Sequence, residues 1–167
     1  MPPSRGYSVA DGGSFRARVI EHWKQTATEG IIADLERCDS AEKRLDALLR
    51  RGFGHNAVLE IRMRAWADNN DEAARALSHI DRRRRDYIER LLADAGIARP
   101  LAATRAQLMY WTYLGAALSR SKLTRERLDR IVAELKLIGL GPLPASVRAP
   151  GSSATARICT RRRRLLV

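Results

Sequence analysis

The chain has 167 residues, and its 31 Lys and Arg against 19 Asp and Glu give a formal net charge of +12. This length suits one domain with a real core, and a hydrophobic content of 45% excludes a wholly disordered chain. The longest apolar run, Leu108 to Leu118, is about half the length that a membrane helix needs, and the first 13 residues lack the apolar stretch of a secretory signal. Cys38 and Cys159 form neither a metal-binding nor a disulfide-framework spacing. We therefore expect a soluble, basic, cytoplasmic protein.

Three helices are predicted in the first half of the chain. The first repeats an apolar residue at every fourth position from Val19 to Leu35, and Ser14 is its expected N-cap. In the second, Asp39 and Glu42 fit a capping box at the amino end. The three helices cover residues 14–37, 39–52 and 57–67.

Three further helices are predicted in the second half. Asn70 and Thr124 are expected to cap two of them at the amino end, and Gly96 and Gly139 are expected to stop them. Pro100 suits the first turn of the helix between these two. These helices cover residues 70–95, 100–119 and 124–139. The pattern predicts an all-α, antiparallel bundle of about six helices over residues 14–140, between disordered residues 1–13 and 141–167.

Two runs of four arginines are candidates for contact with nucleic acid. Arg82–Arg85 have acids at i, i+4 spacing, such as Asp81 before Arg85, so the run is either a salt-bridged, solvated face or a phosphate-binding one. Arg161–Arg164 lie in a Pro-, Gly- and Ser-containing tail that carries six arginines and no acid. This tail is expected to add non-specific attraction to polyanions without adding to the core.

The sequence gives no residues for catalysis or metal binding. It contains no GxSxG, Walker, GxGxxG or HExxH motif. His22, His55 and His79 stand apart from one another, and none has a second His or Cys at metal-ligand spacing on its own helix. We therefore expect no enzyme activity, no metal and no cofactor.

Several aromatic residues occur in the predicted helices, where they lie among Ala, Leu and Met. They suit either a packed core or the wall of an apolar cavity that binds a small molecule, and their spacing does not decide between the two. The residues concerned are Trp23, Trp66, Tyr87, Tyr110, Trp111 and Tyr113.

The stretch VLEIRMRAWADNNDEAARALSHIDRRRRDYIERLLADAGI resembles the regulatory domain of tetracycline-repressor (TetR) family transcriptional regulators. The resemblance lies in Ala65-Trp66-Ala67 before a polar break, in Asp81 to Arg84, and in Ala95-Gly96-Ile97 at the end of the helix. VIEHWKQTA resembles the first helix of that domain, and RAQLMYWTYLGA and RERLDRIVAELKLIGL resemble the final pair that forms the family's dimer interface. The resemblance covers residues 15–140.

This resemblance implies an effector-binding and dimerisation domain of a transcriptional regulator. It implies a small apolar effector among Trp23, Leu59, Met63, Trp66, Tyr87, Leu91 and Tyr110. It implies dimerisation, with a second copy or an intact paralogue, through Tyr110, Trp111, Tyr113, Leu114, Leu118, Leu128, Ile131 and Leu135.

The family's three-helix DNA-binding head has no counterpart in the 13 residues before Ser14. We therefore expect a domain that lacks an intact helix-turn-helix and contacts DNA only non-specifically, through the arginine tail. The alternative is a small basic helical protein that binds nucleic acid non-specifically through its arginine runs.

Overall fold

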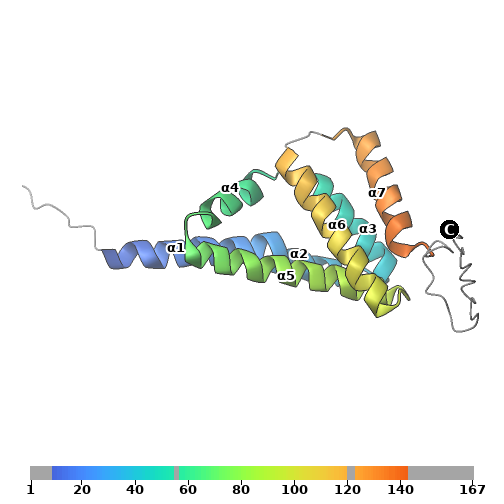
Figure 1. Ribbon diagram of the computed structural model, residues 1–167, viewed down its shortest axis with the longest axis horizontal. Coiled ribbons are helices and arrows are strands. Elements are labelled where there is room, and N and C mark those ends of the chain that lie inside the picture. Colours follow the sequence, from blue (N-terminus) through green and yellow to red (C-terminus); the bar gives the residue numbers. More distant parts are fainter. Residues whose placement is uncertain (1–8, 55–56, 120–122, 143–167) are drawn as a thin grey trace, which may run out of the picture.

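Figure 1 shows the computed structural model, a bundle of helices with no strand in the part that the structure describes, residues 9–54, 57–119 and 123–142. Because α1, the π-helical turn η1 and α2 follow one another without a break, they form one long helical segment. The predicted all-α bundle of about six helices is therefore confirmed. The elements are α1 (Val9–Lys24), η1 (Gln25–Glu29), α2 (Gly30–Leu35), α3 (Ala41–Gly54), α4 (Val58–Ala67), α5 (Asp71–Asp94), α6 (Arg99–Ser119) and α7 (Arg125–Leu140).

The first helical segment differs from the prediction at its beginning. Helix α1 begins at Val9, so Ser14 continues a helix rather than capping one, and residues 9–13 are helical although we expected disorder. No proline between Val9 and Ser14 interrupts the helix, so it extends beyond the apolar stripe. Residues 1–8 of the expected disordered segment, and residues 143–167 of the expected tail, lie outside the described residues.

Side-chain caps fix the amino ends of three helices. The side chains of Asn70 and Thr124 accept the N–H of the residue three positions on, at 2.9 and 3.3 Å, which confirms both predicted caps. At α3 the cap is Ser40, whose hydroxyl accepts the N–H of Lys43 at 3.3 Å. The predicted cap Asp39 instead pairs with the ammonium group of Lys43 at 3.2 Å, because it lies one residue too far from the helix.

The two predicted glycine stops have different roles. Gly96 has φ of 90°, a left-handed conformation that ends α5 as predicted. Gly139 does not stop α7, which continues to Leu140. It is buried against Met109, where a Cβ would collide with the Met109 methyl group, so it allows α7 to approach α6 closely. Arg105 of α6 is buried at the same place and donates to the carbonyl oxygen of Gly139 at 2.8 Å.

The main core lies where α5 and α6 pack together and α3 and α7 cover them. Figure 1 shows α1 and α2 running alongside α5, while the amino-terminal part of α1 projects beyond the bundle. Among the described residues no helix is both long enough and apolar enough to cross a bilayer. Buried core residues include Leu45, Leu49, Leu91, Leu92, Ala106, Met109 and Val132.

Candidate functional site

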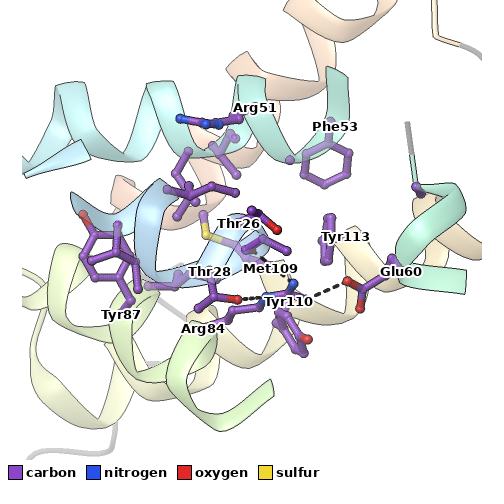
Figure 2. Close-up of a pocket in the computed structure, with 18 of the residues that line it drawn as sticks. Thr26, Thr28, Arg51, Phe53, Glu60, Arg84, Tyr87, Met109, Tyr110 and Tyr113 are labelled. Atoms are coloured by element: carbon purple, nitrogen blue, oxygen red, sulfur yellow. Dashed lines mark hydrogen bonds and ion pairs between the residues drawn. The ribbon is translucent and has the colours of Figure 1, made fainter. Parts of the chain in front are cut away.

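A cavity of about 320 Å³ lies inside the bundle, between η1 and helices α3, α5 and α6, with the first turn of α4 at one side. Its volume is within the range of about 300–1,000 Å³ that is typical of small-molecule sites. Most of its wall is aliphatic or aromatic. Figure 2 shows Phe53, Met109 and Tyr113 among the side chains around it.

The π turn η1 forms part of the wall. The N–H of Gly30 bonds to the carbonyl oxygen of Gln25, five residues back, so the turn holds one more residue than an α-helical turn. Three consecutive residues of η1, Thr26, Ala27 and Thr28, line the cavity. Turns of this kind are frequent at functional sites.

One group of polar side chains in the cavity gathers around Arg84 of α5, whereas Arg51 and Tyr87 line other parts of the wall. The Nε of Arg84 donates to the hydroxyl of Thr28 at 3.0 Å, one terminal nitrogen donates to Glu60 of α4 at 2.9 Å, and the other donates to the carbonyl oxygen of Ala27 at 3.2 Å. Figure 2 shows the first two of these bonds as dashed lines. The Glu60 side chain is only 5% exposed. Arg84 thus ties α5 to both η1 and α4.

A second arginine extends this cluster away from the cavity. Arg64 pairs with Glu60 at 2.7 Å and with Asp81 at 2.8 Å, and it donates to the hydroxyl of Tyr110 at 3.1 Å. The Tyr110 hydroxyl donates in turn to Asp81 at 2.6 Å. We call Glu60, Arg64, Asp81, Arg84 and Tyr110 the Glu60 cluster. Its two carboxylates and two guanidinium groups have a net charge of zero.

Burial and neighbouring charges set the ionisation of this end of the cavity. Burial, and then the neighbouring Glu60 carboxylate, raise the pKa of Tyr113 to about 12, and burial also raises the pKa of Tyr110 well above its ordinary value. Burial acts to lower the pKa of Arg84, but Glu60 and other neighbours outweigh it, so this pKa is above its ordinary value. At neutral pH both tyrosines are therefore neutral and Arg84 is charged.

Aromatic rings hold Arg84 on two sides. The centre of its guanidinium group lies 5.6 Å from the ring centroid of Trp23 and 5.9 Å from that of Tyr113, within cation–π range. The ring of Phe53 meets that of Tyr113 edge to face at 6.4 Å. These contacts give the polar end of the cavity a fixed geometry.

The structure brings together four of the seven residues predicted to contact an effector, Trp23, Leu59, Tyr87 and Tyr110, which line the cavity. Met63 and Trp66 pack in a smaller core cluster that also contains Trp23, and Leu91 is buried in the main core. Glu60 and Thr28 were not predicted from sequence, and Arg84 was named only as a member of the run Arg82–Arg85. The i, i+4 pair of Glu60 and Arg64 was a local signal for Glu60.

The predicted dimer residues divide between the surface and the core. Trp111 and Leu118 are 60% and 54% exposed, whereas Tyr110 and Leu135 are buried inside the bundle. Four others are partly buried against the main core: Tyr113, Leu114, Leu128 and Ile131. Three exposed apolar residues of α6 and α7 lie outside the predicted set of dimer residues: Leu108, Leu137 and Ile138.

The first arginine run bonds mainly within the fold. Arg83 donates to Glu29 at 3.1 Å, and Arg85 donates to the side chain of Gln107 at 2.8 Å. The predicted pairing of Arg85 with the Asp81 carboxylate is wrong, because this face of α5 is covered by other elements whose groups compete for it. Arg85 donates to the main-chain carbonyl oxygen of Asp81, at 3.3 Å, and not to its carboxylate. The second run, Arg161–Arg164, lies outside the described residues.

Among the described residues no group of three or more His, Cys, Asp or Glu side chains is arranged to hold a metal ion. His22 and His79 are exposed, and His55 lies outside the described residues. No family model, curated protein or solved structure matches the chain.

Proposed function

We propose that the chain is the effector-binding and dimerisation domain of a TetR-like transcriptional regulator. The observation that carries the proposal is the cavity of about 320 Å³, whose largely apolar wall ends in the polar groups around Arg84. The resemblance of residues 15–140 to TetR regulatory domains supports it. The charged groups at the cavity bond to one another rather than standing ready for proton transfer, which favours binding over catalysis.

A ligand in this cavity is linked to α1 through the contacts that Arg84 makes with η1. Arg84 holds η1 through Thr28 and the Ala27 carbonyl oxygen, and η1 continues α1. A ligand that bonds to Arg84 therefore changes how η1 and α1 pack against α5. In the family that the chain resembles, the DNA-binding head precedes the corresponding helix. In such a regulator, effector binding favours one position of the helix that corresponds to α1, and so one DNA affinity, over another.

The ligand site is tested by filling it. Gly52 lines the cavity, and a Cβ there would lie 3.5 Å from the ring of Tyr113, so Gly52→Leu extends a side chain into the space without a clash at the Cβ. Gly54→Leu is the matched control, two residues along α3 at an exposed position outside the cavity wall. With N-phenyl-1-naphthylamine as a fluorescent probe, we expect binding to the wild type and to Gly54→Leu and little binding to Gly52→Leu. Equal binding to all three proteins would contradict the proposed site.

An exposed apolar stripe on α6 supports the dimer. Leu108, Trp111 and Leu118 are three and seven residues apart, so they share one face of the helix, and each is at least 48% exposed. Leu137 and Ile138 are exposed on the neighbouring helix α7. A contact with a second copy would remove this apolar surface from water.

Sedimentation equilibrium tests the dimer. We expect a dimer mass for the wild type and a monomer mass for Trp111→Glu. Phe15→Glu is the control, because Phe15 of α1 is equally exposed, at 65%, and lies outside the stripe. A dimer that survives Trp111→Glu, or a wild-type monomer at micromolar concentration, would contradict this interface.

The nucleic-acid alternative receives less support from the described residues, because Arg83, Arg84 and Arg85 all bond within the fold. Titration of random-sequence DNA at two salt concentrations separates the two functions. The alternative predicts tight binding that weakens steeply with salt, and the proposed function predicts weak binding by this domain.

A further inference from the structure

We infer that the cavity accepts a neutral aromatic molecule whose carbonyl oxygen receives a hydrogen bond from Arg84. This inference rests on the proposed function, because it takes the cavity as the effector site. It adds the chemical class of the effector, which follows from three features of the cavity: its charge balance, its unused hydrogen-bond donor and its aromatic wall.

The charge balance favours a neutral ligand. In the Glu60 cluster, the carboxylates of Glu60 and Asp81 offset the guanidinium groups of Arg64 and Arg84. At the exposed side of the cavity, Arg51 is paired with Asp34 at 3.0 Å, and Asp34 also pairs with Arg37 at 3.4 Å, where water screens the charges. At the buried end around Arg84, an anionic or cationic ligand would add a charge that no group balances, and a charge removed from water without a partner is costly.

The polar end offers a donor rather than an acceptor. A guanidinium group has five N–H groups, and the bonds of Arg84 to Thr28, Glu60 and Ala27 use three of them. A further hydrogen bond joins Arg84 to the Tyr110 hydroxyl and helps to raise the pKa of Arg84, so one N–H group of a terminal nitrogen remains for a ligand. The two oxygens of Glu60 already accept, one from Arg84 and the other from Arg64. A ligand gains most by bringing an acceptor, and a carbonyl oxygen can accept from the N–H group that remains.

The wall favours a flat ring. The side chains of Trp23, Phe53 and Tyr113 line the cavity, and two of these rings already flank Arg84. Aromatic rings pair with one another in stacked or edge-to-face arrangements that add to simple area burial. A ring system seated among them brings a carbonyl substituent within reach of the guanidinium group.

Three probes that share one ring system test the class. They are 2-acetylnaphthalene, a neutral ketone; 2-ethylnaphthalene, which has no acceptor; and 2-naphthoate, an anion. Binding to the full-length protein is measured by calorimetry and by quenching of tryptophan fluorescence. A hydrogen bond to a charged group predicts that the ketone binds roughly tenfold or more tightly than the hydrocarbon. We also expect the ketone to bind more tightly than the carboxylate.

The variant Glu60→Gln tests the charge balance. It keeps the size of the side chain and an oxygen acceptor but leaves the cluster with one excess positive charge. We expect the affinity for 2-naphthoate to rise roughly tenfold and to exceed that for the ketone. Glu36→Gln is the matched control, because Glu36 also bonds two arginines, Arg44 at 3.0 Å and Arg90 at 3.1 Å, but lies outside the cavity wall.

The outcomes separate this inference from the proposed function. Equal affinities for ketone and hydrocarbon, or tightest wild-type binding of the carboxylate, would overturn the class while leaving the cavity as a ligand site. If none of the three probes binds, and N-phenyl-1-naphthylamine does not bind either, both the class and the proposed function are wrong. The wild-type series decides the class even if Glu60→Gln does not fold.

Discussion

Two carboxylates in this molecule have nearly the same partners and very different surroundings. Glu60 bonds Arg64, four residues on, and Arg84 from another helix; Asp46 bonds Arg50, four residues on, and Lys136 from another helix. The Glu60 side chain is 5% exposed and faces the cavity, whereas that of Asp46 is 29% exposed at the contact of α3 with α7. The comparison indicates that burial, rather than the number of ion pairs, determines how much stability the fold loses when one member of a cluster is removed.

The largest expected difference is in stability. Glu60→Ala removes the carboxylate partner of Arg84 and one of the two carboxylate partners of Arg64. Because both guanidinium groups are largely buried, we expect the substitution to lower the free energy of unfolding by about 3 kcal/mol or more. Asp46→Ala breaks pairs that water already screens, and we expect a loss of about 1 kcal/mol or less. Urea denaturation of both variants measures these values. Equal losses would show that the difference in burial has no energetic consequence.

Double-mutant cycles sharpen the same comparison. Replacing Glu60 and Arg84 together by Met removes both charges, so we expect the double variant to be more stable than either single one, with a coupling energy of about 1–3 kcal/mol. For the corresponding change at Asp46 and Lys136 we expect a coupling of about 0.2–1 kcal/mol. A coupling at Glu60 as small as that at Asp46 would contradict the account.

The stability of the protein at alkaline pH tests the part of the comparison that concerns the cavity. The pKa of Tyr113 is raised to about 12 by burial and then by the nearby Glu60, so the folded state holds the phenolic proton more tightly than the unfolded chain. The resulting stabilisation is complete below the ordinary pKa of 10.0 and is lost as the pH rises to about 12. We expect Tyr113→Phe to make the decline of stability over this interval shallower. Thermal unfolding at a series of pH values measures it, and an unchanged slope would contradict the prediction.

The stability of the protein at acid pH tests the part of the comparison that concerns Asp46, where we expect the smallest effect. The hydrogen bond from Lys136 lowers the pKa of Asp46 below its ordinary value of 3.8, against the opposing effect of partial burial. The folded state therefore holds this proton less tightly than the unfolded chain. Its stabilisation is present above pH 3.8 and is lost as the pH falls below that value. We expect Asp46→Asn to be slightly less stable than the wild type at neutral pH and equal to it in strong acid. A difference that persists in acid would point to another cause.

The helices could be predicted from sequence because local signals specify them. Asn70, Thr124 and Gly96 act within one turn of the helix ends that they fix, so a single sequence is enough to identify them. A signal for η1 was also present. Apolar residues at strict four-residue spacing from Val19 to Leu35 overshoot each α-helical turn by about 40°, and a π turn with one extra residue offsets part of this drift.

The candidate site could be predicted only in part. Aromatic residues in helices pointed to a cavity or a core, and Trp23 and Tyr110 do line the cavity. The polar end was missed because its partners are far apart in sequence: Arg84 meets Glu60 across 24 residues and Thr28 across 56. Local spacing instead predicted a pairing of Asp81 with Arg85, since i, i+4 neighbours are the only partners that a helix shows before its packing is known.

The central claim is that the cavity binds a neutral aromatic ligand through Arg84, and a crystal structure of the full-length protein with 2-acetylnaphthalene tests it most directly. The account predicts the naphthalene ring among Trp23, Phe53 and Tyr113, with the carbonyl oxygen within hydrogen-bond distance of the Arg84 guanidinium group. A ligand bound elsewhere on the protein, or one seated in the cavity with its carbonyl oxygen directed away from Arg84, would contradict it.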